Sequence, residues 1–282
     1  MLTPFRGKSA VLTGASAGLG EEFAVQLADL GVSRIVLTAR RAERLAHLRA
    51  TLLAANPELR VDVITADLSD AADVTELIGA LNALDLTCDI LINNAGFGDL
   101  GTFESSDASK IEEMLAVNMT ALTRLTHWAV PGMVARRRGW ICNVGSTAGL
   151  LALPSFAVYA ATKAYVNSFS EALRVELRGT GVNVLALCPG PVETEFGAVA
   201  SRANSKRQFA PPAALCVHKK DVVRETLSAM ARGKGRLIPG ILVRIPMLMA
   251  ESTPRWLLRL VFNFTSGGFQ KERAARRQNP AG

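Results

Sequence analysis

The 282-residue sequence is poor in the residues that build disulfide frameworks and metal centres. It has four cysteines, far apart along the chain: Cys88, Cys142, Cys188 and Cys216. This spacing predicts neither a disulfide scaffold nor a zinc site, and it fits a reducing, cytoplasmic setting. The histidines are also few and scattered: His47, His127 and His218. We therefore predict no metal site.

Long apolar runs are lacking too. No stretch reaches the roughly 18 apolar residues expected of a membrane-spanning helix. A strand pattern starts at Ser9, before the apolar region of a signal peptide could form. The formal net charge of +7 is gathered largely in short groups rather than in an even stripe, so nucleic-acid binding is not predicted. Solvated surface charge is the main interpretation, and attraction to an anionic cofactor or to lipid headgroups is the alternative.

Strand and helix patterns alternate from residue 8 to about residue 240. We expect strands over 9–12, 34–38, 61–65, 89–92, 140–144, 182–187 and 236–239, and helices over 21–30, 42–55, 70–84, 107–137, 155–178 and 221–231. Such alternation with short links predicts an α/β fold, in which helices cover both faces of one parallel sheet. With 49% hydrophobic residues, the chain can fill the core of this fold.

Two regions depart from the alternation. The segment 195–220 is polar and irregular, whereas 241–264 is apolar but interrupted by charged residues and prolines. Beyond Gly267 and Gly268 the tail is basic. We therefore divide the chain into a domain over 1–240 and an extension over 241–282. The extension is expected to pack on the domain or to form a subunit interface, and contact with a membrane surface is a further alternative.

A glycine-rich motif, Thr13-Gly14-x-x-x-Gly18-x-Gly20, joins the first strand to the first helix. In this context Gly14 allows a tight turn and Gly18 leaves room for a pyrophosphate. Gly20 lets the helix lie close to the strand. The free N–H groups at the helix start can then bind phosphate. The motif predicts a dinucleotide site.

The same residues contain a rival motif. Gly14-Ala15-Ser16-Ala17-Gly18 also matches G-x-S-x-G, the nucleophile motif of serine hydrolases. A hydrolase using Ser16 would need an acid and then a histidine downstream, and His218 is late enough in the chain. However, the motif follows the first strand, so no earlier strand can supply the oxyanion loop, and Gly20 is left without a function. The hydrolase is therefore kept as an alternative.

The end of the second strand indicates which nicotinamide cofactor is used. An NAD site normally has Asp or Glu there, which binds the ribose 2′-hydroxyl. Here the position holds Ala39, and Arg40 follows. No carboxylate would repel a 2′-phosphate, and a guanidinium can bind it through two hydrogen bonds. We therefore predict NADP(H).

A phenol and an ammonium share one face of the helix expected over 155–178. Tyr159 and Lys163 are four residues apart, whereas Tyr165 has Phe169 at the same spacing. A nearby positive charge favours a phenolate, so this pair can exchange protons with a carbonyl or an alcohol. Ser146 follows the fifth strand, where an open α/β sheet places its ligands.

Taken in order, these motifs resemble the short-chain dehydrogenase/reductase family over about residues 8–240. The matching pieces are the glycine motif, Asp67-Leu68, Asn93-Asn94-Ala95-Gly96, Asn118, Ser146, Tyr159-x-x-x-Lys163 and Pro189-Gly190-Pro191-Val192-x-Thr194. The resemblance implies a single-domain Rossmann fold with a seven-stranded parallel sheet, usually as a homodimer or homotetramer. It also implies an oxidoreductase that moves a hydride between NADP(H) and a carbonyl or alcohol carbon.

The resemblance also implies roles for individual residues. Tyr159 is the catalytic acid/base, and Lys163 lowers its pKa and holds the nicotinamide ribose. Ser146 orients the carbonyl, and Asn118 anchors a water in a proton relay. Asp67 meets the adenine. The full implied set of cofactor contacts is Gly14, Ser16, Gly18, Leu19, Gly20, Arg40, Asp67, Leu68, Asn94, Ala95, Gly96, Tyr159, Lys163, Pro189, Gly190, Val192 and Thr194.

The segment 195–220 corresponds to the family's substrate lid. Leu150, Leu151, Leu153 and Phe156 either line an apolar pocket or belong to the core. We expect an apolar ketone or alcohol as substrate, with a 3-oxoacyl thioester as the alternative. A non-catalytic NADPH sensor is a further alternative, although a sensor has no need of the complete catalytic set.

Overall fold

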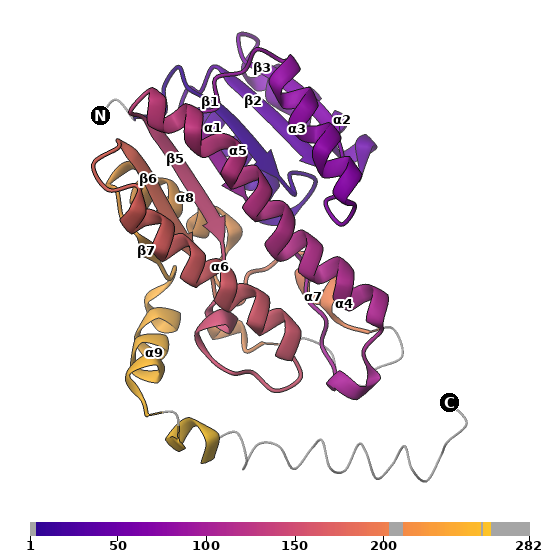
Figure 1. The fold of residues 1–282 in the computed structure, drawn as a ribbon, viewed down its shortest axis with the longest axis vertical. Helices are drawn as coiled ribbons and strands as arrows, with labels where there is room; N and C mark the ends of the chain where they lie inside the picture. The colour runs from indigo at the N-terminus through magenta and orange to yellow at the C-terminus, as the bar shows by residue number, and fades with distance from the viewer. Residues whose placement is uncertain (1–3, 203–210, 255, 261–282) are drawn as a thin grey trace.

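Seven parallel strands form one sheet at the centre of the molecule (Figure 1). The computed structural model describes residues 4–202, 211–254 and 256–260. The strand order is β3-β2-β1-β4-β5-β6-β7, and every pairing is parallel. The strands are β1 (Ser9–Thr13), β2 (Arg34–Ala39), β3 (Arg60–Thr65), β4 (Ile90–Asn93), β5 (Gly139–Val144), β6 (Val182–Leu187) and β7 (Arg236–Leu237).

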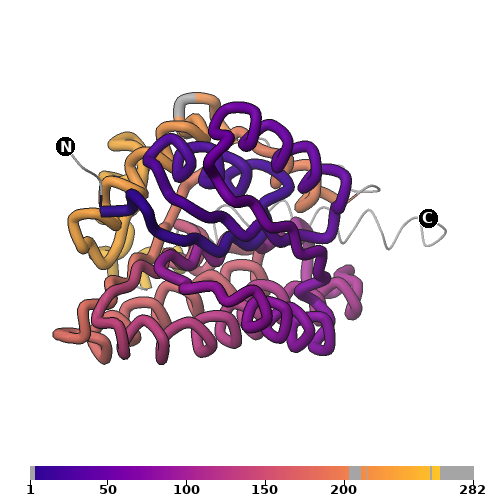
Figure 2. The backbone as a smooth tube through the Cα atoms, turned by 90° about the horizontal axis from the view of Figure 1, so that it is seen from above, coloured from indigo at the N-terminus to yellow at the C-terminus, as the bar shows by residue number. Residues whose placement is uncertain are grey.

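Helices cover both faces of the sheet (Figure 2). One face carries α1 (Gly18–Asp29), α2 (Ala42–Ala55) and α8 (Lys219–Ala231). The other carries α3 (Ala71–Ala83), α5 (Leu122–Ala135) and α6 (Ala157–Glu176). Neighbouring strand residues supply opposite layers, because side chains alternate along a strand: Leu12 packs in the first layer and Val11 in the second. The predicted α/β fold with helices on both faces is therefore confirmed.

The position of the candidate site follows from the strand order. β1 pairs with β2 on one side and with β4 on the other. The strands that follow β1 in sequence are therefore added first on one side of it, as β2 and β3, and then on the other, from β4 to β7. In an open α/β sheet, ligands bind outside the carboxyl ends of the strands at such a switch point. The glycine motif, 93–96, Ser146 and 189–194 all follow the carboxyl ends of strands here.

The helix expected over 107–137 is present but not uniform. α4 (Ala108–Leu115) passes into a π-helical segment, Ala116–Ala121, before α5 begins. Single π-helical turns are rare in proteins, and those that do occur often lie at functional sites. Asn118 lies within this segment.

Both irregular regions contain helices. The segment expected to be irregular over 195–220 includes α7 (Phe196–Ala200), and the extension begins with α9 (Ile241–Ser252). Pro246 lies inside α9 and removes one helical N–H. Residues 203–210 of the expected lid and the basic tail over 261–282 lie outside the described residues.

Candidate active site

The glycine turn is packed against the end of β4. Gly14 and Gly18 have positive φ, +63° and +60°. A Cβ on Gly14 would lie 2.8 Å from Asn94 Nδ2, and a Cβ on Gly20 would collide with the Gly14 carbonyl. Asn94 Nδ2 donates to the carbonyls of Thr13 and Gly14 at 3.0 and 3.1 Å. These contacts explain why glycine is required at these positions.

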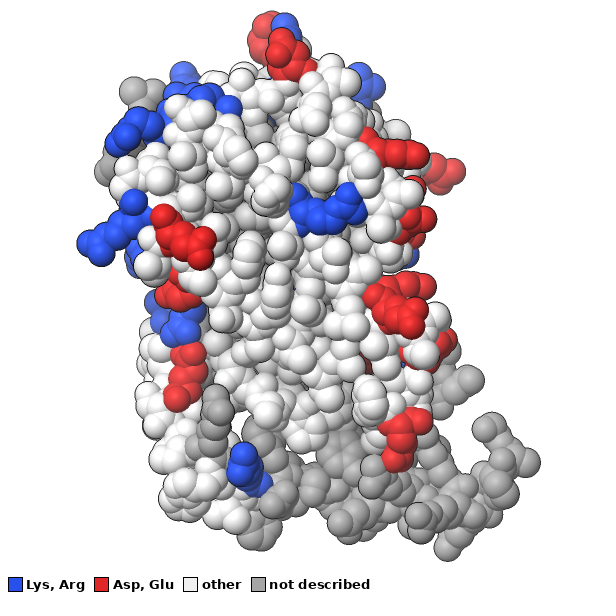
Figure 3. Space-filling model, viewed as in Figure 1, with Lys and Arg blue, Asp and Glu red and all other residues white. Residues whose placement is uncertain are grey.

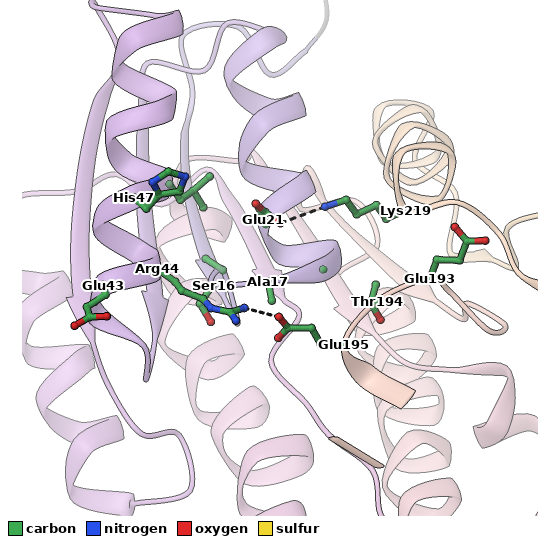
Figure 4. Close-up of a pocket in the computed structure, with 13 residues that line it drawn as sticks. Ser16, Ala17, Glu21, Glu43, Arg44, His47, Glu193, Thr194, Glu195 and Lys219 are labelled. Atoms are coloured by element: carbon green, nitrogen blue, oxygen red, sulfur yellow. Dashed lines mark hydrogen bonds and ion pairs between the residues drawn. The ribbon is translucent and has the colours of Figure 1, made fainter. Parts of the chain in front are cut away.

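The start of α1 suits a bound phosphate. Its N-cap is Ala17, which has no side-chain oxygen to satisfy the first N–H groups of the helix. A cleft of about 470 Å³ lies between the glycine turn and residues 193–195 (Figure 4). Thr194 faces Gly18 across the cleft, because a Cβ on Gly18 would lie 3.2 Å from Thr194 Cγ2. Uncapped N–H groups beside an open cleft fit the pyrophosphate of a dinucleotide.

Two arginines follow the end of β2. Ala39 is the last strand residue and is buried, so no carboxylate is present at this position. Arg40 is exposed, and its Nη1 lies 3.7 Å from Asp67 Oδ2. Arg41 Nε donates to Ser16 Oγ at 3.2 Å. Burial raises the pKa of Asp67, but hydrogen bonds from Ser69 and the charge of Arg40 lower it on balance.

Sequence reasoning missed Arg41 and Glu195 as candidate site residues. Glu195 Oε2 lies 2.9 Å from Arg41 Nη1, and Arg44 Nη1 contacts the other oxygen of the same carboxylate. The Arg40-Arg41 pair could have indicated Arg41. No local signal could have indicated Glu195, because it lies 154 residues from Arg41 in the sequence.

Tyr159, Lys163 and Ser146 come together around the carboxyl end of β5. Tyr159 and Lys163 lie on α6 and are both buried, and Ser146 is the N-cap of a short 3-10 turn after β5. Lys163 Nζ lies 5.8 Å from the Tyr159 ring centroid and donates to the Val144 carbonyl at 2.7 Å. A Cβ on Gly96 would lie 3.1 Å from the same Nζ, so this glycine leaves room for the lysine.

Burial dominates the protonation behaviour of this cluster. It raises the pKa of Tyr159 to about 12, and hydrogen bonding with the Ser146 side chain offsets only part of the rise. Burial also lowers the pKa of Lys163 to about 8. On balance the pKa of Tyr159 is raised, because burial of the phenol outweighs its hydrogen bond with Ser146. The lowering by Lys163 that the family resemblance implies stays a prediction.

The side chain of Asn118 holds a neighbouring loop. Its Nδ2 donates to the Phe97 carbonyl and to Thr162 Oγ1, both at 3.0 Å, and its Oδ1 accepts from the Phe97 N–H at 3.1 Å. Both amide hydrogens are therefore used within the protein. Since Asn118 is fully buried, these bonds fix the segment after β4 beside Tyr159.

Aromatic rings enclose the phenol of Tyr159. The ring centroids of Phe156 and Phe196 lie 5.6 and 5.3 Å from that of Tyr159. Leu153 packs in the same cluster. Leu150 instead packs against the core cluster that contains Val243 of α9. Leu153 and Phe156 of the predicted set thus form an apolar cluster around Tyr159 together with Phe196 of α7, and their role as pocket residues stays a prediction.

The segment 189–194 is held over the site by contacts from several elements. Thr147 N and Oγ1 donate to the Pro189 carbonyl at 3.0 and 3.2 Å. Gly190 packs on α9, because a Cβ there would lie 2.7 Å from Val243 Cγ1. Val192 forms a bridge with Val217. The Thr147 contacts place 189–194 against the carboxyl end of β5, and the approach of Thr194 to Gly18 places it against the glycine turn.

The hydrogen bond between serine and histidine that the hydrolase alternative requires is not found among the described residues. Ser16 Oγ instead accepts from Arg41. His218 Nδ1 accepts from the Lys220 N–H and caps α8. In the same part of the chain, no group of histidine, cysteine and acidic side chains could hold a metal ion. Nor, within it, is any helix both long and apolar enough to cross a bilayer.

A family model described as short chain dehydrogenase matches residues 8–205. The chain belongs to the short-chain dehydrogenase/reductase family. Over 202 residues it is 39% identical to the NADP-dependent 3-hydroxy acid dehydrogenase YdfG of Salmonella typhi, covering 70% of this chain and 78% of the relative. The structure of a Sphingobium yanoikuyae short-chain dehydrogenase in complex with NADPH is similar, with a TM-score of 0.76 and 30% identity over 89% of this chain and 95% of that one.

A Burkholderia phymatum member of the same family, solved in complex with NAD, has a TM-score of 0.76 and 29% identity and covers 91% of this chain and 95% of that one. Short-chain dehydrogenases/reductases therefore occur with either cofactor among the similar structures. This chain is an NAD(P)-dependent oxidoreductase that acts on CH–OH donors or the corresponding carbonyls.

Proposed function

We propose that the protein uses NADP(H) to interconvert a ketone and an alcohol in an apolar substrate. The observation that carries the choice of NADP(H) is the end of β2, where buried Ala39 takes the place of an acidic residue and two arginines follow. The end of β2 thus has no carboxylate to repel a 2′-phosphate, and it offers guanidinium groups to bind it. The NADP dependence of the Salmonella typhi relative supports the same choice.

The side chains around Tyr159 would divide the chemistry as follows. NADP(H), when bound, supplies or accepts the hydride. Tyr159 donates its phenolic proton to the carbonyl oxygen in reduction and accepts a proton as phenolate in alcohol oxidation. Ser146 donates a hydrogen bond to the same oxygen. Lys163 binds the nicotinamide ribose.

Asn118 and the remaining cofactor contacts complete the proposed site. The side-chain bonds of Asn118 to Phe97 and Thr162 orient the surroundings of Tyr159. Because both amide hydrogens are used in these bonds, a water that relays protons would have to donate to an oxygen of Asn118. The glycine turn, Asp67-Leu68 and 94–96 would line the dinucleotide from adenine to nicotinamide, together with Pro189, Gly190, Val192 and Thr194.

An apolar substrate fits the surroundings of the phenol. Phe156, Phe196 and Met114 pack around Tyr159. A nearby cation, Arg202, is committed to a buried acid, because its Nη2 lies 2.5 Å from Asp99 Oδ2. It therefore offers little to an anionic substrate. An apolar ketone is accordingly preferred over a free hydroxy acid.

A 3-oxoacyl thioester is the second candidate substrate. The Salmonella typhi relative acts on a 3-hydroxy acid, which is oxidised at the same carbon position. An acyl chain would pack against the apolar cluster around Tyr159, while the thioester would lie toward the opening of the site.

For assembly we propose a homodimer or homotetramer in the cytoplasm. Figure 3 shows a broad, largely uncharged surface over α5 and α6, interrupted by one basic group over α5 and bordered by acidic and basic groups. Three exposed residues in the first part of α6 are small: Ala161, Ala164 and Ser168. Small, uncharged side chains allow a second copy to approach closely.

The outer face of α9 is a second surface suited to contact. It exposes the apolar side chains Ile241, Leu242, Ile245, Leu248 and Met249. The charged residues of α9 form ion pairs with the rest of the domain, where Arg244 pairs with Glu225 and Glu251 pairs with Arg236. A subunit interface is the first candidate use of this face. Peripheral contact with an anionic membrane is the second, since exposed Trp256 and basic residues follow in the sequence.

A substrate panel tests the proposed function. Apolar ketones, their alcohols and a 3-oxoacyl thioester are incubated with NADPH or NADH, and nicotinamide absorbance is followed. We expect reduction of at least one apolar ketone with NADPH and a lower kcat/KM with NADH. Turnover confined to the thioester would select the second candidate, and a preference for NADH would overturn the proposed cofactor.

A further inference from the structure

One carboxylate holds two arginines beside the glycine turn. Glu195 Oε2 lies 2.9 Å from Arg41 Nη1, and Glu195 Oε1 lies 2.5 Å from Arg44 Nη1. Figure 4 shows Glu195 reaching from the segment after Thr194 toward Arg44 on α2. The contact therefore joins the start of the segment 195–220 to the start of α2, across the mouth of the cofactor cleft.

The same guanidinium groups lie where the fold distinguishes its two cofactors. Arg41 follows the end of β2 by two residues, and its Nε donates to Ser16 Oγ in the glycine turn. The ribose 2′ position is recognised between these two elements. A guanidinium binds carboxylate and phosphate with the same fork of N–H groups, so a 2′-phosphate and Glu195 are interchangeable partners. A neutral 2′-hydroxyl offers no such exchange.

We propose that Glu195 competes with the 2′-phosphate of the cofactor for Arg41 and Arg44, and thereby sets how strongly the site distinguishes NADP(H) from NAD(H). This inference rests on the proposed use of NADP(H). Binding of NADP(H) displaces the carboxylate from the arginines, whereas NAD(H) leaves it in place. Glu195 is thus a specificity-determining residue that weakens the preference created by the arginines.

The solvent exposure of the three side chains determines how much Glu195 weakens binding of the 2′-phosphate. Arg41, Arg44 and Glu195 have side chains that are 44%, 50% and 48% exposed. Exposed ion pairs contribute little individually and are screened by salt. Removing the competing carboxylate should therefore strengthen binding of a 2′-phosphate by about three- to tenfold at low ionic strength. The gain should shrink as salt is added.

Calorimetric titration with two cofactor fragments tests the proposal without turnover. Adenosine 2′,5′-bisphosphate carries the 2′-phosphate, and adenosine 5′-monophosphate lacks it. We expect Glu195→Gln to lower the dissociation constant of the bisphosphate by about three- to tenfold and to leave that of the monophosphate unchanged. Thermal unfolding of each variant checks that the fold is retained.

Glu193 provides the matched control. It lines the same cleft two residues earlier, and its carboxylate points away from Arg44 in Figure 4. Among the described residues Glu193 makes no ion pair, so Glu193→Gln changes the net charge equally without freeing an arginine. An equal gain in Glu193→Gln, or an equal change for both fragments in Glu195→Gln, would overturn the role of Glu195.

The wild-type titration separates this inference from the proposed function. Wild-type protein that binds the two fragments equally would overturn the preference for NADP(H). A wild-type preference for the bisphosphate that Glu195→Gln fails to increase would overturn the role of Glu195 alone.

Discussion

The ammonium of Lys163 is held by the main-chain carbonyl of Val144, 2.7 Å from Nζ, rather than by an acidic side chain. A hydrogen bond to a neutral carbonyl orients the lysine but does not offset the cost of burying its charge. The pKa of Lys163 is accordingly lowered to about 8, while burial raises that of Tyr159 to about 12. The proton donor and its cationic neighbour therefore titrate in different pH ranges.

The pH dependence of reduction should report Lys163. Its ammonium form is populated below pH about 8 and is lost as the pH rises through that value. Because kcat/KM reports the free enzyme, kcat/KM for NADPH should fall above pH about 8. Lys163→Arg keeps its charge at higher pH and should remove this fall, although its activity will be lower. A profile for the wild type that stays flat to pH 10 would contradict the assignment.

Arg40 should carry the largest share of the cofactor preference, because Glu195 partly neutralises Arg41 and Arg44. Hydrogen bonds to charged groups are worth about 1.5–3 kcal/mol each, and 1.36 kcal/mol is roughly tenfold in rate. Arg40→Ala should therefore lower kcat/KM for NADPH by about ten- to a hundredfold and barely change it for NADH. Ala39→Asp should go further, since a carboxylate repels the 2′-phosphate and accepts from the free ribose hydroxyl. An equal loss with both cofactors in Arg40→Ala would show that another residue binds the phosphate.

The surface over α5 and α6 and the apolar face of α9 should determine the oligomeric state. Wild-type protein should have a mass above the 30.1 kDa of one chain in light scattering. Ala164→Glu places a charge in the α6 surface, and Ile245→Glu places one in the α9 face. Each variant should lower the mass if its surface is an interface. If Ile245→Glu keeps the mass of the wild type but no longer sediments with anionic liposomes, the α9 face binds a membrane. A monomeric wild type would rule out both interfaces.

The sequence was sufficient to predict the architecture because its signals are local. Strand and helix periodicity, the glycines at 14, 18 and 20, and the spacing of Tyr159 and Lys163 each depend on neighbours in the chain. Gly14 and Gly20 are explained by contacts within the predicted strand–turn–helix unit and with Asn94. These features follow from the backbone of the fold itself.

Other features depend on contacts between distant segments and could not be predicted. The pKa of Tyr159 is governed by burial, and Phe156 and Phe196 are among the residues that pack on its ring. Phe196 lies in α7, a helix that the polar sequence of 195–220 does not predict. The ion pairs of Glu195 likewise require the chain after β6 to return to α2. Their strength and partners are set by tertiary packing alone.

The central claim is that Tyr159 supplies the proton, and the chain offers a close control because it contains only two tyrosines. Tyr165 lies on the same helix, but its hydroxyl is 2.8 Å from Thr123 Oγ1 and its ring stacks on Phe169. The deciding measurement is kcat for reduction of the best ketone by NADPH in Tyr159→Phe and in Tyr165→Phe, with NADPH binding measured in parallel. We predict that Tyr159→Phe abolishes turnover and keeps NADPH binding, whereas Tyr165→Phe stays within a few-fold of wild type. Near-normal turnover in Tyr159→Phe would contradict the account.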